Sequence, residues 1–197
     1  MPSGEHDRQS GFTLVELIVV MAILPGLMLL VYSVLVGVLK DTRSVTERAE
    51  AVSQSRLAVA QMERQIRSGN VLFAPSDNSM QIFTQANGMQ RCVQWRVETD
   101  GQLRTRAWQS DGSGVTAWRT VARNVFNTQA RVTAGTAPRP FTLQGGTTAF
   151  NSRLISIRLL TQVSSKGGKP VEVNTSVSGR NTQYGNAVST CTPVPAG

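Results

Sequence analysis

The chain has 197 residues, 40% of them hydrophobic, and its 20 Lys and Arg residues against 12 Asp and Glu residues set a formal net charge of +8. The only histidine, His6, lies near the N-terminus, and two cysteines cannot form a four-thiolate zinc site. The acids beyond residue 69 are few and scattered, and no phosphate-binding glycine motif is present. We therefore predict no enzyme activity, no metal and no cofactor.

A long apolar segment begins close to the N-terminus. Residues 11–39, GFTLVELIVVMAILPGLMLLVYSVLVGVL, contain one charged side chain, Glu16. The 23 residues from Leu17 to Leu39 carry no charge, and at about 1.5 Å per residue they span the roughly 30 Å core of a bilayer as a helix. This is longer than the apolar core of a cleaved secretory signal, about 7–15 residues, and no A-x-A-like site follows it. The pattern predicts a membrane helix over residues 12–39.

The residues before this helix carry a recognisable motif. The string Gly11-Phe12-Thr13-Leu14-Val15-Glu16, followed at once by the apolar run, resembles the processing motif of type IV prepilins and pseudopilins. The resemblance implies that residues 1–11 are a leader, which a membrane prepilin peptidase removes by cutting after Gly11 on the cytoplasmic side. It also implies N-methylation of the new N-terminal Phe12, with the apolar helix retained on the mature protein.

Glu16 needs a physical reason to lie in an apolar segment. A carboxylate there costs about 2.5–3.5 kcal/mol on insertion scales. Cleavage after Gly11 would create a compensating charge, because the Phe12 ammonium would lie four residues from Glu16, at the positive end of the helix dipole. In the family, the matching glutamate is thought to neutralise the N-terminus of a neighbouring subunit in the filament. The alternative is a signal anchor whose Glu16 reaches the headgroups.

Two features of the membrane helix leave alternatives open. Pro25 lacks a backbone donor and clashes with the carbonyl of Met21, so we expect a kink or local melting of the helix. The resemblance favours loosening in the filament, whereas a tolerated kink is the simpler interpretation. Arg8 precedes the helix while Lys40 and Arg43 follow it, so the charges indicate no clear orientation. Placement of the C-terminal part outside the cytoplasm, anchored by a single membrane pass, follows from the resemblance.

Residues 40–68 predict an amphipathic continuation of the helix. Arg56 interrupts its apolar stripe, Glu63 is placed to pair with Arg67 at i+4, and Gly69 is suited to end the helix. The apolar residues recur at spacings of three, four and seven: Val45, Ala49, Val52, Val59, Met62 and Ile66. We expect this stripe to pack against a sheet.

Residues 69–197 are expected to form an antiparallel β-sheet head domain. Asp100-Gly101 predicts a tight hairpin turn, Asp111–Gly114 a looser turn, and Ser164–Pro170 the loop between the last two strands. The predicted strands are Ser79–Thr84, Arg91–Thr99, Gln102–Gln109, Val125–Thr133, Arg153–Val163 and Val171–Ser178. The predicted fold class is thus α+β, with a long N-terminal helical spine packed on the sheet, which is the type IV pilin architecture.

The resemblance extends weakly beyond the motif. The string from Arg56-Leu57 to Met62–Arg67 and the late run Thr175–Asn181 resemble J-type minor pseudopilins and W-type minor pilins, while Glu16 argues against the K-type tip subunit. We therefore predict a structural subunit that assembles with other pilin or pseudopilin subunits, near the tip or in initiation. The machine would be a type IV pilus, a type II secretion system or a DNA-uptake system.

The basic head suggests an alternative function. A stripe containing Arg91, Arg96, Arg104 and Arg106 would let the filament bind DNA or an anionic surface through salt-dependent contacts. No aromatic-rich nucleic-acid motif accompanies these arginines, and an arginine-heavy composition can equally reflect a GC-rich genome.

The two cysteines complete the expectations for the head. If the head lies outside the membrane, its compartment is oxidising, and we expect a disulfide between Cys92 and Cys191. The link would hold the C-terminal tail on the sheet.

Overall fold

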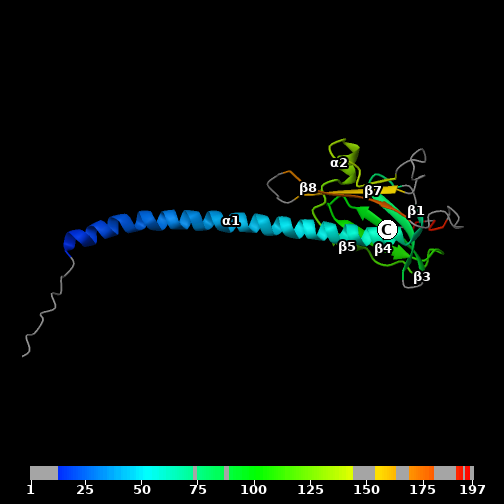
Figure 1. The fold of residues 1–197 in the computed structure, drawn as a ribbon, viewed down its shortest axis with the longest axis horizontal. Coiled ribbons are helices and arrows are strands. Elements are labelled where there is room, and N and C mark those ends of the chain that lie inside the picture. The colour runs from blue at the N-terminus through cyan, green and yellow to red at the C-terminus, as the bar shows by residue number, and fades with distance from the viewer. Residues whose placement is uncertain are drawn as a thin grey trace, which may run out of the picture. The chain divides into compact units, whose positions relative to one another are not determined.

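The structure is a computed structural model, and it describes residues 13–72, 75–86, 89–143, 154–162, 169–179, 190–192 and 194–195. The chain divides into two compact units, Met1–Val45 and Thr46–Gly197. Helix α1 (Leu14–Arg67) contributes to both units, and the second unit adds two antiparallel sheets and a short helix (Figure 1). The predicted α+β fold class is confirmed.

The larger sheet is a five-stranded meander in which strands that follow one another in the chain are neighbours. The strands are β1 (Gly69–Leu72), β2 (Ser79–Ala86), β3 (Met89–Val97), β4 (Leu103–Trp108) and β5 (Arg119–Ala122). The predicted hairpin at Asp100-Gly101 joins β3 to β4. Gly101 has φ +76°, and a Cβ on it would lie 2.9 Å from the carbonyl oxygen of Val125. Glycine is required there both by conformation and by space.

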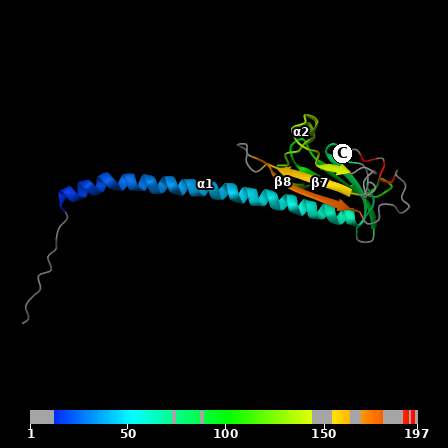
Figure 2. The same cartoon turned by 45° about the horizontal axis from the view of Figure 1, so that its top comes forward.

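The smaller sheet has the order β6-β7-β8, built from β6 (Phe141–Leu143), β7 (Leu154–Thr161) and β8 (Val171–Ser178). The hairpin expected between the last two long strands is confirmed by their pairing, from Leu154 opposite Ser178 to Thr161 opposite Val171. Most of the loop predicted at Ser164–Pro170 lies outside the described residues. Figure 2 shows α2 (Gln129–Thr133) on one side of this sheet and α1 on the other.

The predicted strand at Val125–Thr133 is wrong. Val125 makes one isolated bridge to Thr161, and helix α2 occupies the end of the segment. The side chain of Asn127 hydrogen-bonds backbone groups of β7 that a neighbouring strand would otherwise pair with. Its Nδ2 donates to Arg158 O at 2.6 Å, and its Oδ1 accepts from Leu160 N at 3.1 Å. Strands β1, β5 and β6 were not predicted, because three or four residues are too few to show an alternation of period two.

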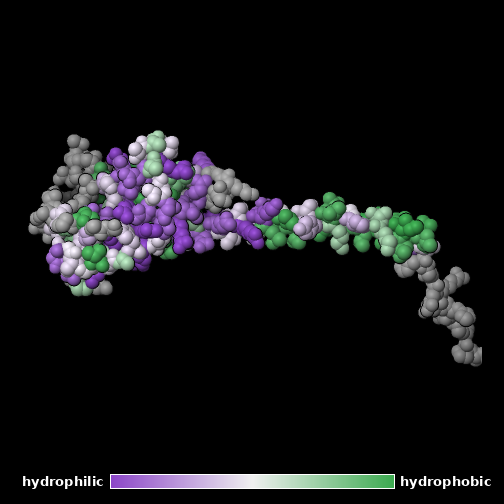
Figure 3. Space-filling model, turned by 180° about the vertical axis from the view of Figure 1, so that it is seen from behind, coloured by the Kyte–Doolittle hydropathy of each residue, from purple (hydrophilic) through white to green (hydrophobic). Residues whose placement is uncertain are grey.

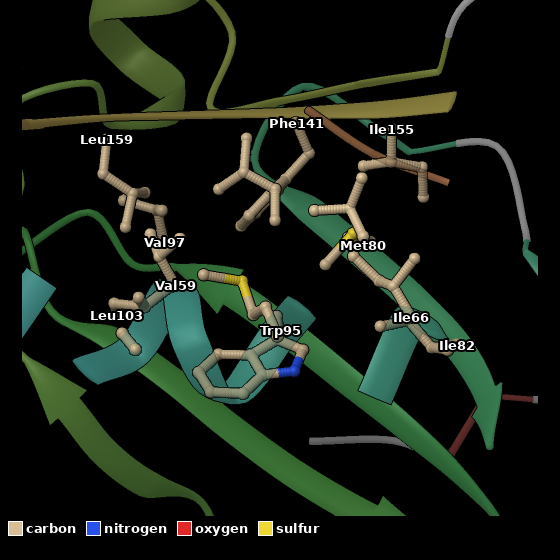
Figure 4. Close-up of a cluster of buried hydrophobic side chains, with 14 of the residues drawn as sticks. Val59, Ile66, Met80, Ile82, Trp95, Val97, Leu103, Phe141, Ile155 and Leu159 are labelled. Atoms are coloured by element: carbon tan, nitrogen blue, oxygen red, sulfur yellow. The ribbon is translucent and has the colours of Figure 1, made fainter. Parts of the chain in front are cut away.

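One hydrophobic core joins α1 to both sheets. The larger sheet contributes alternate residues of β3, Val93, Trp95 and Val97, as predicted, and the smaller sheet contributes Ile155, Ile157 and Leu159 of β7. Figure 4 shows side chains of both sheets, among them Trp95 and Ile155, converging with Val59 and Ile66 of α1. The residues of α1 that are buried in this unit are Ala51, Ser55, Ala58, Val59, Met62 and Ile66. The helix is therefore the layer that both sheets share.

Several details of α1 differ from the sequence prediction. The buried stripe starts at Ala51, while Val45 is 65% exposed. The stripe also includes a polar residue, Ser55, whose hydroxyl lies 2.7 Å from that of Thr161. Among the described residues no ion pair joins Glu63 to Arg67, since Glu63 Oε1 accepts a hydrogen bond from Thr175 at 2.8 Å. The helix continues without a break through Pro25, so this subunit shows no melting there.

The C-terminal tail covers the other face of the larger sheet. Cys191 is bonded to Cys92 on β3, with their Cα atoms 5.6 Å apart, and both residues are buried in a cluster with Phe83 and Trp108. Val194 packs against the same cluster, and Arg106 donates a hydrogen bond to the carbonyl of Pro195. The central strands of this sheet are consequently covered on both faces.

Replacement of a core residue of α1 should destabilise the head. Met62 is 0% exposed, whereas Leu57, five residues earlier on the same helix, is 67% exposed. We expect Met62→Ala to lower the free energy of unfolding by about 2–5 kcal/mol, and Leu57→Ala by about 0.5 kcal/mol or less. All three tryptophans lie beyond residue 90, so thermal unfolding followed by tryptophan fluorescence reports on this unit. Equal effects of the two substitutions would contradict the assigned packing of α1.

The disulfide should form in the native protein and stabilise the head. Mass spectrometry of unreduced protein should find a linked Cys92–Cys191 peptide pair and no free thiols. Because the link closes a loop of 99 residues, its loss in Cys191→Ser should lower stability by at most about 4.7 kcal/mol on the chain-entropy model. Ser113→Ala, in an exposed turn, provides a control. Two free thiols in native protein would contradict the pairing.

Candidate functional site

The start of α1 is capped by Thr13. The backbone N–H of Glu16 donates to Thr13 Oγ1 at 3.3 Å, and the N–H of Leu17 donates to Thr13 O at 3.2 Å. Thr13 is therefore the N-cap, and Glu16 is the third residue of the first turn. The string Thr13-Leu14-Val15-Glu16 fits the capping-box pattern S/T-x-x-E. This signal is present in the sequence, although it was not among the features predicted above.

Glu16 lies where a helix favours an anion. Glu16 is the only acid in the first turn of α1, and it is exposed. Unpaired N–H groups place partial positive charge at this end of the helix, which stabilises a nearby carboxylate by about 0.3–1 kcal/mol. Phe12 directly precedes the N-cap in the sequence. A free amino group on Phe12 would thus add a full positive charge next to the first turn that holds Glu16.

Gly11 and Phe12 themselves lie outside the described residues. The predicted cleavage and methylation at these positions therefore remain predictions. Cys92 and Cys191, the other predicted pair, are joined in the second unit, as described above.

The apolar part of α1 presents its side chains outward within its own unit. Leu14, Val20, Leu30 and Leu39 are each more than half exposed, and this pattern is repeated along the segment. Figure 3 shows hydrophobic residues along the N-terminal part of α1, and a mainly hydrophilic surface on the visible face of the second unit. By length and composition α1 is apolar enough to cross a membrane.

The four arginines proposed as a DNA-binding stripe do not form one exposed surface. Arg106 is only 5% exposed; burial, and after it the nearby Arg96, lower the pKa of Arg106 below its ordinary value. Arg96 pairs with Glu98 at 2.6 Å, and Arg104 pairs with Asp100 at 3.5 Å. Arg96 and Arg106 also each stack over the ring of Trp118 at 4.4 Å. Three of the four arginines therefore have partners within the head.

Within the part of the chain that the structure describes, no group of three or more His, Cys, Asp or Glu side chains could hold a metal ion.

The comparisons with known proteins bear on the N-terminal segment. The prokaryotic N-terminal methylation motif matches residues 6–24, which include Gly11, Phe12 and Glu16. No curated protein and no solved structure matches the chain significantly. The motif marks substrates of prepilin peptidase that assemble with other pilin subunits, and the apolar helix and antiparallel head agree with the pilin fold. In its motif and its fold, this chain resembles the type IV pilins.

Proposed function

We propose that this protein is a structural minor pilin or pseudopilin, cut by prepilin peptidase between Gly11 and Phe12 and methylated on Phe12. It would assemble with other subunits near the tip of a filament or in its initiation. The machine would be a type IV pilus, a type II secretion system or a DNA-uptake system, and the subunit would be of the J or W type. The head would lie outside the cytoplasm, where a disulfide between Cys92 and Cys191 persists.

One observation supports this proposal above the others: a Thr13-capped helix whose first turn holds Glu16, directly after Phe12. On insertion scales a carboxylate costs about 2.5–3.5 kcal/mol at the centre of a membrane helix and less near the helix end, where Glu16 lies, and the helix dipole returns roughly 0.3–1 kcal/mol. A cation close to Glu16 would offset the cost that the helix dipole leaves. Cleavage after Gly11 provides one on Phe12, and helices that bundle bring such an ammonium to the Glu16 of a neighbour.

We do not propose DNA binding as a second function. Arg96, Arg104 and Arg106 have partners within the head, so the stripe that would carry this function is not available to phosphates as a unit.

Cleavage should depend on the residue at position 11. Gly11→Val should block processing, so that the precursor accumulates in the membrane with residues 1–11 attached. The control is Gly37→Val, because a Cβ at Gly37 meets nothing within 4 Å and this glycine lies far from the motif. N-terminal mass analysis of the membrane-bound protein distinguishes the two forms. A parent protein that still begins at Met1 in its native membrane would contradict the proposal.

The charge of Glu16, and not its contribution to capping, should be required for assembly. Glu16→Gln keeps a side chain suited to a capping box but removes the charge, while Thr13→Ala removes the cap and keeps the charge. We expect Glu16→Gln and Glu16→Ala to be cleaved and stable yet poorly incorporated into filaments. Thr13→Ala should weaken the first helical turn by about 0.5–2 kcal/mol and still be incorporated.

Cross-linking to partner subunits in native membranes measures incorporation. If both Glu16 variants join their partners as efficiently as the parent, charge compensation is not the role of this residue. If Thr13→Ala alone fails to assemble, the motif acts through helix capping.

A further inference from the structure

The outward side of α1 in the second unit carries three arginines around an apolar centre. At 3.6 residues per turn, the three arginines fall on the side of the helix opposite the buried Ala58, Met62 and Ile66. Leu57 is 67% exposed, more than the large apolar side chains of Met89 and Val115 in the same unit, which are 56% and 45% exposed. We name this surface the arginine face; it consists of Arg56, Leu57, Ala60, Arg64 and Arg67, all exposed.

The acids of the head are already committed elsewhere. Five acids occur beyond Gly69. Four of them form the described ion pairs Arg96–Glu98, Arg104–Asp100, Arg139–Asp77 and Arg158–Glu172, at 2.6, 3.5, 2.9 and 2.7 Å. The fifth, Asp111, accepts a hydrogen bond from the N–H of Ser113 within its own turn. None of these carboxylates pairs with an arginine of α1.

The acid nearest to the arginine face along α1 is also engaged. Glu63 would be placed to pair with Arg67 at i+4, but its Oε1 accepts from Thr175 of β8 at 2.8 Å. Gln65 is likewise turned inward, where its Oε1 accepts from Trp95 Nε1 at 2.7 Å. Arg64 and Arg67 remain as like charges one turn apart, an arrangement that slightly destabilises a helix. Among the described residues no acid pairs with Arg56, Arg64 or Arg67, so the carboxylates of another molecule can reach all three.

We propose that the arginine face docks a helix of a different filament subunit, one that carries carboxylates at one-turn spacings around small apolar residues. The partner's class, another filament subunit, rests on the proposed function. A second copy of this chain does not fit through the same face, because the two identical faces would bring guanidinium against guanidinium. The exposed Leu57 and Ala60 suit a packed protein surface better than a row of phosphates.

A charge-reversed variant of this chain can serve as the complementary partner in a test of the arginine face. The face variant Arg56→Glu/Arg64→Glu/Arg67→Glu presents carboxylates at the same spacings around Leu57. The control variant Arg123→Glu/Arg131→Glu/Lys169→Glu changes the net charge equally at exposed positions outside α1. Full-length chains labelled with a donor or an acceptor are inserted together into vesicles of neutral phosphatidylcholine, and energy transfer is measured at low and high salt.

We expect parent and face variant together to give several-fold more transfer than parent with parent or parent with control variant, and the excess to fall at high salt. Thermal unfolding by tryptophan fluorescence confirms that each variant is folded. If the triple face variant does not fold, Arg56→Glu/Arg64→Glu, which leaves the last residue of α1 unchanged, replaces it in the same measurement.

Equal transfer with the face and control variants would overturn the inference, since net charge alone would then account for association. Transfer between parent chains as strong as between parent and face variant would also overturn it. Loss of binding to duplex DNA or to phosphatidylserine vesicles in the face variant alone, without excess transfer, would assign the face to phosphate groups instead. Processing is read separately, from the N-terminal mass in native membranes. A processed chain without excess transfer refutes the docking face and leaves the proposed function intact.

Discussion

The head depends on burial of one side of α1 between two sheets. Met62 and Ile66 are completely buried, and they contact a core to which both the five-stranded and the three-stranded sheet contribute. The same buried cluster takes Trp95 from the larger sheet and Ile157 from the smaller one. The helix therefore does more than anchor the head, since it is the layer that makes the two sheets one unit.

Strand β3 of the larger sheet is covered on both of its faces. The helix covers Val93, Trp95 and Val97, while the C-terminal tail covers Cys92 on the opposite face. Arg106 lies under this tail, where Gln94 accepts from its Nε and Pro195 accepts from its terminal nitrogen. The Arg106 guanidinium thus serves as a buried hydrogen-bond donor and not as a surface charge. These partners are needed because burying a guanidinium without them would cost several kcal/mol.

Charge is divided unevenly over the molecule. The few acids of the head hold arginines of the sheets and loops in place, while Glu63 is held by Thr175. Arg158 donates from two nitrogens to the two oxygens of Glu172, and this hydrogen bonding lowers the pKa of that carboxyl. On the outward side of α1, Arg56, Arg64 and Arg67 form no ion pair with any described residue, and Glu16 in the first turn likewise forms none. Both places present a charge that another molecule can pair with.

Local signals in the sequence determined the N-terminal motif, the presence of a long N-terminal helix, the Asp100-Gly101 turn and the long alternating strands. Each depends on spacing along the chain, such as period two in β3 or 23 uncharged residues after Glu16. Only the tertiary structure decided where the buried stripe of α1 begins, that Val125–Thr133 is not a strand, and which arginines are surface charges. Burial and pairing depend on residues that are distant in the sequence. Asn127 hydrogen-bonds β7 through its side chain where a strand was predicted, and Glu63 accepts a hydrogen bond from Thr175, 112 residues away, instead of pairing with Arg67.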